Sequence, residues 1–284
     1  MLSLIEKANT LVEALPYIKN FSGKTFVIKY GGAAQKDISL KSAFAQDVVL
    51  LNFIGIHPVV VHGGGPRISE MMRKLGKEPA FVDGQRVTDP ETMEIVEMVL
   101  GGLINKEIVS LIGSHGGKAI GLTGKDGFLI KAEKKAVPPG GADLGLVGNV
   151  REINSEILLN LQKEDFITVI TPVGVGPDGQ SLNINADTVA QAVAAALKAE
   201  KLILLTDVPG ILEEGKTVST LGANKAARMI EEGVISGGMI PKTLACLDAL
   251  RAGVGKTHIL DGRIPHCLLL EIFTREGVGT EITH

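Results

Sequence analysis

The chain has 284 residues, of which 45% are hydrophobic and 21% are charged, and its formal net charge is −3. This length allows two domains, and the slightly acidic balance argues against a non-specific surface for nucleic acid or anionic membranes. Because the chain has only two cysteines, no signal-peptide core and no apolar run of transmembrane length, it is expected to be a cytoplasmic protein without a disulfide framework.

The first twenty residues predict a helix. A single apolar stripe follows one of its faces and consists of Leu4, Ala8, Leu11 and Leu15. Pro16 should bend or end this helix. Two uses of the stripe are open, because it precedes the first predicted strand: it can pack on its own domain, or it can join copies of the chain as an oligomerisation helix.

Short apolar runs then alternate with helical patterns. Strands are predicted at residues 25–30, 58–62, 167–172, 201–207 and 257–260. Helices are predicted at residues 40–53, 66–75, 90–112, 187–198, 225–232 and 239–252. This order predicts an α/β fold in which a mainly parallel, open sheet has helices on both faces, a three-layer αβα sandwich.

Two segments interrupt this alternation. Between residues 119 and 150 short polar strands and turns predict a hairpin at the rim of the fold. Residues 173–181, VGVGPDGQS, are rich in glycine and separate two halves of βα character. They are either a linker or an active-site loop, and we place the boundary between an N-terminal lobe, 1–178, and a C-terminal lobe, 179–284.

The run VVVHGGGP, residues 59–66, joins a predicted strand to a predicted helix through three glycines. Free N–H groups at a helix N-terminus bind anions, and glycine allows a ligand to touch the backbone. The run is neither a P-loop nor GxGxxG. HGGG also occurs in the oxyanion loops of some esterases, but the chain has no GxSxG elbow, which removes the main support for a hydrolase.

A second glycine loop follows the first strand in VIKYGGAA, residues 27–34. Lys29 lies at the carboxyl end of this strand, where ligands of open α/β folds bind. An edge lysine that only extends into solvent is the alternative. With two glycine loops after two strands, an anion site is about as plausible as this alternative.

Two further stretches contain polar groups between apolar ones. In NINAD, residues 183–187, Asn183, Asn185 and Asp187 are spaced by two, and Asp187 stands where a helix N-cap is expected. In GGMIPK, residues 237–242, Lys242 lies in the first turns of a helix, where a cation opposes the helix dipole unless an anion lies nearby. A plain cap and a surface lysine remain the alternatives.

Together these motifs indicate phosphoryl transfer. That chemistry depends on lysines, backbone N–H groups and Mg²⁺ that position and neutralise oxygen charge, and it needs no nucleophilic side chain. His57, His62 and His115 lack the spacing of metal ligands and are interpreted as structural.

The motifs KYGG, VVVHGGGP, DGQRVTD, NINAD, LLTDVPGIL and GGMIPK occur in this order over nearly the whole chain. In this arrangement the chain resembles the amino-acid kinase superfamily, and most closely those members that phosphorylate N-acetyl-L-glutamate. The resemblance implies an open αβα sandwich with an amino-acid site in the N-terminal half and an ATP site in the C-terminal half. It also implies transfer of phosphate from ATP to the side-chain carboxylate of N-acetyl-L-glutamate, an early step of arginine synthesis.

The resemblance also implies roles for single residues. Lys29 and Lys242 match the two catalytic lysines, and Asp187 matches the aspartate that holds both. The expected substrate contacts are Gly32, Gly64, Gly65, Arg86 and Asn183, in which Arg86 grips the α-carboxylate of the substrate. The expected nucleotide contacts are Asp207, Val208, Pro209, Gly210, Ile211, Leu212, Val234, Ile235 and Ser236. Mg²⁺ is expected to arrive with ATP, without ligands from protein side chains.

Both ends of the chain resemble members of the superfamily that arginine inhibits. In those members an N-terminal helix links dimers into a hexamer, a trimer of dimers. The resemblance places an arginine effector at Tyr17, Lys201, Glu271 and Gly279, with LLEIFTREGVGTEI, residues 269–282, as the shared C-terminal stretch. A PII-type signalling protein, which binds some photosynthetic relatives, is a further partner to consider.

Two other functions remain open at this stage. The chain could be a kinase of the same superfamily for another acceptor, such as glutamate, aspartate or carbamate. It could also be a non-catalytic amino-acid sensor with the same fold, although Lys29, Asp187 and Lys242 argue against a sensor.

Overall fold

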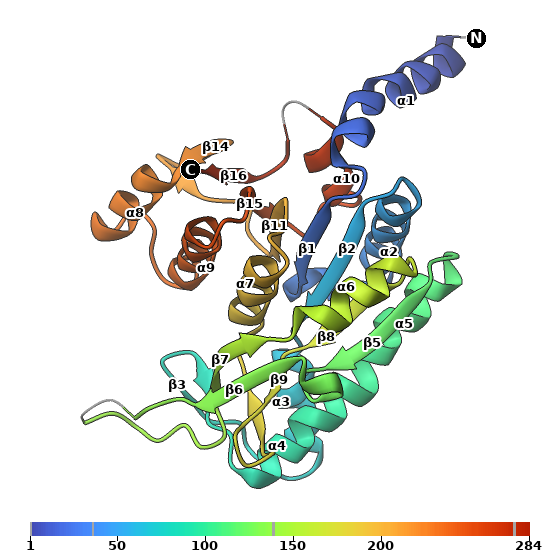
Figure 1. The fold of residues 1–284 in the computed structure, drawn as a ribbon. Helices are drawn as coiled ribbons and strands as arrows, with labels where there is room; N and C mark the ends of the chain where they lie inside the picture. The colour runs from blue at the N-terminus through green and yellow to red at the C-terminus, as the bar shows by residue number, and fades with distance from the viewer. Residues whose placement is uncertain (1, 36, 138–139, 275–276) are drawn as a thin grey trace.

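The computed structural model describes residues 2–35, 37–137, 140–274 and 277–284. Helices cover both faces of a central sheet, which confirms the expected three-layer α/β architecture (Figure 1). In the described residues this sheet has eight strands in the order β14-β16-β15-β11-β1-β2-β8-β5. Their bounds are β1 Thr25–Tyr30, β2 His57–His62, β5 Ala119–Thr123, β8 Ile167–Thr171, β11 Lys201–Thr206, β14 Thr220–Gly222, β15 Lys256–Asp261 and β16 Thr280–Thr283.

Neighbouring strands of this sheet are parallel except for β15 and β16. The side chains of β1 alternate between two apolar clusters, because Phe26 and Ile28 face one cluster and Val27 faces the other. A strand that is buried on both faces in this way is typical of a parallel sheet between helical layers. The carboxyl ends of β1, β2 and β11 therefore meet at one edge of the sheet.

Smaller sheets extend this edge. One has the order β10-β9-β6-β7, and the other two are the pairs β3-β4 and β12-β13. Their bounds are β3 Phe81–Val82, β4 Gln85–Arg86, β6 Ile130–Lys134, β7 Gly148–Ile153, β9 Val173–Val175, β10 Ser181–Asn183, β12 Leu212–Glu213 and β13 Lys216–Thr217. β6 and β7 pair antiparallel, so the predicted hairpin is confirmed, and we call the segment between them, residues 135–147, the β6–β7 arm.

The sequence did not predict the helices at residues 155–163 and 267–273, but every helix that it predicted lies close to one of the helices of the structure. The helices are α1 Leu2–Phe21, η1 Gly32–Gln35, α2 Ile38–Phe53, α3 Gly65–Lys74, α4 Pro90–Glu97, η2 Met98–Ile104, α5 Asn105–Ser114, η3 Asp126–Phe128, α6 Ser155–Lys163, α7 Ala186–Ala196, α8 Ala223–Glu231, α9 Met239–Arg251 and α10 Cys267–Phe273. The predicted helix at 90–112 is not continuous α-helix, because η2 is a π-helical segment. Its adjacent glycines, Gly101 and Gly102, carry no side chains that would resist a wider turn.

The N-terminal helix does not end at Pro16. α1 continues through Pro16 to Phe21 and contacts α10, while its first turns project from the body of the molecule (Figure 1). The last turn is anchored by aromatic contacts, in which Tyr17 packs edge-on against Phe273 and Phe21 packs edge-on against Phe26. These contacts offset the hydrogen bond that the proline removes.

The strands of the two sequence halves occupy different sides of the large sheet. β1, β2, β5 and β8 lie on one side, and β11 and β14–β16 lie on the other, with β1 next to β11. The predicted boundary at residue 178 falls between β9 and β10, which pair with each other. A division into two lobes at this residue stays a prediction.

Candidate active site

Asp187 joins two lysines at the junction of the two sides of the sheet. β1 supplies Lys29, the first turn of α7 supplies Asp187, and the first turns of α9 supply Lys242. Lys29 Nζ lies 3.0 Å from Asp187 Oδ1, and Lys242 Nζ lies 2.8 Å from Oδ2. The structure thus brings together three residues that are 158 and 55 positions apart in the sequence.

The carboxyl group of Asp187 is ionised in this environment. Burial alone would raise its pKa, but the ammonium groups of Lys29 and Lys242 outweigh burial and hold the pKa below the usual range. Asp187 is not the N-cap of α7, contrary to expectation. Asn185 is the cap, because its side chain accepts from the backbone N–H groups of Asp187 and Thr188 at 2.8 and 3.2 Å. The Asp187 carboxylate is therefore free for the two lysines.

The two glycine loops lie beside this ion-pair group. A Cβ added at Gly31 would lie 2.9 Å from Lys29 Nζ, so the lysine side chain folds back over the loop. Gln35 ties the loops together, because its Nε2 donates to the carbonyl oxygens of Tyr30 and Gly63, at 3.1 Å in each case. Gly32, predicted as a backbone donor, begins η1 with φ +68°, a conformation that favours glycine.

In the loop after β2, Gly64 has no room for a side chain, whereas Gly63 and Gly65 do. A Cβ at Gly64 would lie 2.4 Å from Ile104 Cδ1 and 2.6 Å from Leu100 Cδ2. Gly65 is the first residue of α3, followed by Pro66, so the first N–H groups of that helix have no partners within the helix. The structure thereby provides the backbone donors that the sequence predicted for an anion.

Arg86 is fixed by neighbours on α3 and β3. Its Nη2 donates to the carbonyl oxygen of Gly65 at 2.9 Å and to Ser69 Oγ at 2.8 Å, and its guanidinium lies 4.7 Å from the centre of the Phe81 ring. Burial lowers the pKa of Arg86, although the guanidinium stays charged. One positive group is therefore held rigidly next to the glycine loop.

Arg86 and the glycine loop after β2 line an open cleft of about 360 Å³. The predicted substrate residues Gly64, Gly65, Arg86 and Asn183 all lie on its wall. Gly32 does not line it. Asn185 and Gly63, which belong to the NINAD and HGGG motifs, also line the cleft, but the sequence interpretation missed other lining residues, among them Phe81, Lys135, Thr188 and Pro241. Pro241 and Asn185 are neighbours of Lys242 and Asp187, so the cleft reaches toward the ion-pair group. Lys135 directly follows β6, and no pattern in the sequence relates it to the cleft.

The predicted nucleotide residues fall on two loops. Residues 207–212 follow the carboxyl end of β11, and a Cβ at Gly32 would lie 3.4 Å from Asp207 Oδ1, which places Asp207 beside the first glycine loop. Residues 234–236 lie between α8 and α9. Ile211 and Ile235 belong to an apolar core, so their side chains serve packing. The backbone N–H of Ile211 already donates to Thr280 Oγ1 at 2.9 Å.

Of the four residues predicted for arginine, Lys201 begins β11, at the end of the strand opposite to the glycine loops. Lys201 Nζ lies 3.0 Å from His258 Nε2, and His258 Nδ1 lies 2.8 Å from Glu271 Oε1. Burial would raise the pKa of Glu271, but its bonds with His258 and the backbone outweigh burial and hold the pKa below the usual range. His258 was not predicted, since a histidine within an apolar strand pattern gives no separate signal.

Tyr17 and Gly279 complete this region. Tyr17 packs on Phe273 of α10, the helix that carries Glu271, and a Cβ at Gly279 would lie 2.3 Å from the carbonyl oxygen of Ile259. Lys201 also lies 5.2 Å from the centre of the Phe21 ring on α1. The last turn of α1 is thus directly connected to the buried charges.

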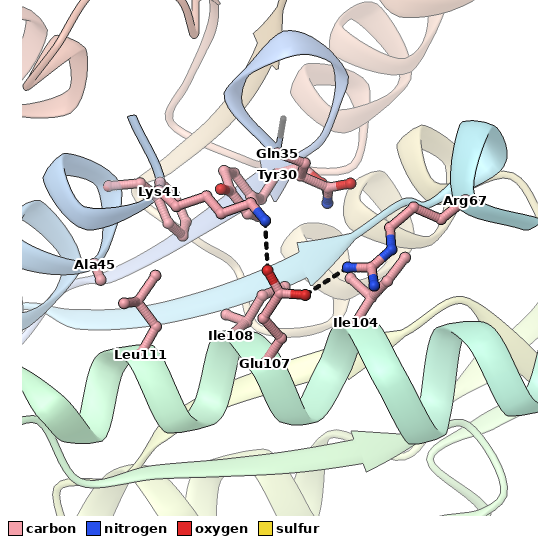
Figure 2. A pocket seen from close by; sticks show the side chains of 10 residues that line it. Tyr30, Gln35, Lys41, Ala45, Arg67, Ile104, Glu107, Ile108 and Leu111 are labelled. Carbon is pink, nitrogen blue, oxygen red and sulfur yellow. Dashed lines mark hydrogen bonds and ion pairs between the residues drawn. The ribbon is translucent and has the colours of Figure 1, made fainter. Parts of the chain in front are cut away.

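A second, enclosed pocket lies between α2, α3 and α5 (Figure 2). At its mouth Glu107 Oε1 accepts from Lys41 Nζ and Oε2 accepts from Arg67 Nη1, at 2.5 Å in each case. The pocket measures about 20 Å³, which is too small for a substrate. We interpret the Lys41–Glu107–Arg67 group as a tie between three helices.

The described residues contain no group of three or more histidine, cysteine, aspartate or glutamate side chains that could hold a metal ion. Within the same residues, no helix is long and apolar enough to cross a membrane.

The chain belongs to the amino acid kinase family, whose pattern matches residues 24–261, and the resemblance found in the sequence is thereby confirmed. Among its relatives, the acetylglutamate kinase of Persephonella marina is 58% identical over 294 residues, which cover 98% of each chain. The acetylglutamate kinase of Sulfurihydrogenibium sp. is 56% identical over 298 residues and covers 100% of each chain.

Solved structures of a longer protein are also similar. The N-acetylglutamate synthase of Neisseria gonorrhoeae, complexed with coenzyme A and N-acetyl-glutamate, superposes with a TM-score of 0.86 at 27% identity. The match covers 98% of this chain but only 63% of the synthase. The same synthase complexed with coenzyme A and L-arginine gives a TM-score of 0.84 at 26% identity and covers 97% of this chain and 65% of the synthase.

Proposed function

We propose that this chain is an acetylglutamate kinase, which transfers the γ-phosphoryl group of ATP to the side-chain carboxylate of N-acetyl-L-glutamate. The products are N-acetyl-L-glutamyl 5-phosphate and ADP, and the reaction belongs to arginine biosynthesis. The observation that carries the proposal is the bridge between Lys29, Asp187 and Lys242 beside a cleft with backbone donors. Full-length relatives with this activity in their names support it.

The two lysines act as fixed positive charges in the proposed reaction. A carboxylate oxygen of the acceptor forms a bond to the γ-phosphorus, while the bond from that phosphorus to the oxygen that bridges it to the β-phosphorus breaks. Lys29, on the acceptor side, and Lys242, on the nucleotide side, neutralise the charge on the transferred group. Each such preorganised donor contributes about 2.7–4 kcal/mol to lowering the barrier. Asp187 keeps the lysines in place and balances their charge when no phosphate is bound.

The acceptor occupies the cleft in this proposal. Arg86 pairs with its α-carboxylate, since a planar guanidinium suits a carboxylate. The N–H groups around Gly64 and Gly65, at the N-terminus of α3, stabilise its side-chain carboxylate. Asn183 contacts the same substrate.

ATP use follows from the family, and we propose that its phosphates lie between Lys242 and residues 207–212, with the adenosine near residues 234–236. Gly32 and Asp207 are adjacent at this edge, where the carboxyl ends of β1 and β11 meet. Mg²⁺ is proposed to enter with ATP, held by the nucleotide phosphates. Bound there, Mg²⁺ supplies further positive charge against the phosphate oxygens.

An ADP-release assay with three acceptors tests the proposal. With saturating ATP, kcat/KM for N-acetyl-L-glutamate should be at least about a hundredfold higher than for glutamate or aspartate. Glutamate and aspartate carry a free ammonium group, which does not fit a site for an acylated nitrogen. Turnover with another acceptor alone would make the chain a different kinase of the same family. Absence of turnover with all three, together with arginine binding, would favour a sensor.

Regulation by arginine is part of the proposal. Lys201, Glu271, Tyr17 and Gly279 surround one region in which the buried carboxylate of Glu271 can accept from a guanidinium and Lys201 can pair with a carboxylate. The exposed apolar residues of α1, which include Leu4, Leu11 and Leu15, support contacts between dimers in a hexamer. A cytoplasmic location fits a biosynthetic role, and a PII-type protein remains a candidate partner.

Truncation of α1 tests both parts of this regulation. Removal of residues 1–20 should reduce the mass in light scattering from a hexamer to a dimer, and arginine should then inhibit more weakly. A truncated protein that is still hexameric would contradict the role of α1.

A further inference from the structure

Thr88 is hydrogen-bonded to both residues whose side chains are proposed to hold the acceptor. It follows β4, its side chain is fully buried, and its hydroxyl group makes two hydrogen bonds. Thr88 Oγ1 donates to the carbonyl oxygen of Arg86 at 3.0 Å. The same oxygen accepts from Nδ2 of Asn183 at 3.1 Å. One hydroxyl group therefore connects the backbone of Arg86 with the side chain of Asn183.

The direction of these bonds follows from their chemistry. A backbone carbonyl can only accept, and a hydroxyl group has one hydrogen, so the hydrogen of Thr88 is committed to Arg86. Toward Asn183 the hydroxyl can then only accept. The amide of Asn183 must turn its NH₂ group to Thr88, and its carbonyl oxygen becomes the free end at the cleft, which Asn183 lines.

We propose that Thr88 is a positioning residue that fixes the amide of Asn183 with its carbonyl oxygen toward the acceptor. This inference rests on the proposed function. With both carboxyl groups ionised, N-acetyl-L-glutamate has one hydrogen-bond donor, the N–H of its acetamido group. An acceptor held at Asn183 fits that group, whereas an amide that turned freely would present its NH₂ group equally well.

The backbone around Thr88 is held firmly enough for this role. Its N–H donates to the carbonyl oxygen of Leu144 at 2.9 Å, and its carbonyl oxygen accepts from Leu146 at 2.6 Å, so the β6–β7 arm holds it on both sides. The backbone N–H of Asn183 donates to Leu146 in turn, at 2.8 Å. Loss of the hydroxyl alone therefore leaves the backbone of all three segments in place.

The experiment compares Thr88→Val, which keeps the shape and removes the hydroxyl, with Thr88→Ser, which restores it. Thr168→Val is the matched control, because Thr168 is equally buried in β8 and its hydroxyl has no hydrogen-bond partner among the described residues. Thr88→Val should raise the KM for N-acetyl-L-glutamate roughly tenfold, as expected for a lost buried hydrogen bond, and change kcat and the KM for ATP less than about twofold. Thr88→Ser and Thr168→Val should resemble the wild type.

A substrate analogue separates positioning from a general loss of stability. In 2-acetoxyglutarate an ester oxygen replaces the N–H of the acetamido group. The wild type should prefer N-acetyl-L-glutamate over this analogue, because two acceptors would face each other at Asn183. In Thr88→Val that preference, measured as the ratio of the two kcat/KM values, should shrink about tenfold. The side-chain amide of Asn183 can then rotate and present its NH₂ group to the ester oxygen.

Several results would overturn the inference. It fails if Thr88→Val keeps the wild-type preference for N-acetyl-L-glutamate over the analogue. It also fails if the wild-type enzyme uses both acceptors equally. Because this second measurement needs no variant, the inference stays testable even if Thr88→Val folds poorly. It also fails if Thr168→Val matches the loss in Thr88→Val. Absence of any turnover of N-acetyl-L-glutamate by the wild type would instead contradict the proposed function.

Discussion

At the scale of single residues, Asp187 has two demands placed on it. It must stay ionised although it is only 7% exposed, and it must hold two lysines that reach it from different strands and helices. The lysines themselves meet the first demand by lowering the pKa of the carboxyl group. Because the side chain of Asn185 caps α7, both carboxylate oxygens of Asp187 remain available to hold the two lysines.

Replacement of this carboxylate should therefore damage catalysis more than binding. We expect Asp187→Asn to lower kcat by roughly 100- to 1,000-fold, as for other preorganised charges, because the lysines lose their common partner. The KM for N-acetyl-L-glutamate should change only a few-fold. Steady-state kinetics of Asp187→Asn and of a control, Asp248→Asn on the exposed face of α9, measure both effects. A kcat near that of the wild type would remove Asp187 from the mechanism.

His62 should make the folded protein sensitive to acid. Burial lowers the pKa of this imidazole from 6.5 to about 4. Between these values the unfolded chain binds a proton that the folded chain does not, so stability falls as the pH drops through this range. Two pH units in this range correspond to about 2.7 kcal/mol, at 1.36 kcal/mol per unit.

Urea unfolding at pH 7 and pH 4.5 measures this effect. The wild type should lose about 2–3 kcal/mol more of its unfolding free energy than His62→Asn does between the two pH values. The carboxyl group of Asp47, whose pKa burial raises to about 6, acts in the opposite direction, but it is present in both proteins and cancels in the difference. Equal losses in both proteins would show that His62 carries no such linkage.

At the scale of elements, the sequence predicted β1, β2, β8, β11 and β15 close to their bounds, but it missed β14, β16 and the interruptions of helices. The first strand is predicted at its observed bounds because its apolar run ends at a glycine pair on one side and a turn on the other. α1 continues past Pro16 because of contacts with residues 26 and 273, which local sequence does not reveal. For the same reason the π-helical segment η2 and the N-cap at Asn185 were missed. Local propensity favours a regular α-helix in place of η2, and it favours Asp187 as the N-cap of α7.

Some parts of the candidate site are predictable from local sequence and others are not. Its glycine loops follow from local pattern, since strand, glycine and helix N-terminus are adjacent in the sequence. The convergence of Lys29, Asp187 and Lys242 was expected only from family resemblance, because no local pattern relates them. Thr88 and His258 were missed because their importance depends on partners that only the folded chain brings to them.

The β6–β7 arm supplies a test at the scale of elements. Gly145 has φ +72°, and a Cβ there would lie 2.3 Å from the carbonyl oxygen of Thr88, whereas Gly140 has φ +73° and nothing within 4 Å. Gly145→Ala should displace the arm from Thr88, and the KM for the acceptor should rise at least about tenfold, because a backbone contact is lost in addition to the conformational cost. Gly140→Ala carries the conformational cost alone.

Kinetics of the two glycine variants separate these contributions. If Gly140→Ala raises the KM as much as Gly145→Ala does, the contact between the arm and Thr88 has no influence on the cleft.

At the scale of the whole molecule, the sheet separates two groups of charges. The carboxyl edge holds Lys29 and the glycine loops, whereas the amino end of β11 holds Lys201 next to His258. β11 connects these places directly, and it lies next to β1, where the two sides of the sheet meet. We propose that an effector bound at the amino end of β11 acts on Lys29 and Lys242 by shifting the two sides of the sheet relative to each other. This requires that the effector bind more tightly to one arrangement of the two sides than to the other.

Trapping the product tests most directly whether the paired lysines drive transfer of phosphate to a carboxylate. With ATP, N-acetyl-L-glutamate and hydroxylamine, the acyl phosphate should be captured as N-acetyl-L-glutamyl 5-hydroxamate in amounts equal to the ADP released, and Lys242→Ala should reduce both at least about a hundredfold. ADP release without hydroxamate, or an unchanged rate in Lys242→Ala, would contradict the claim.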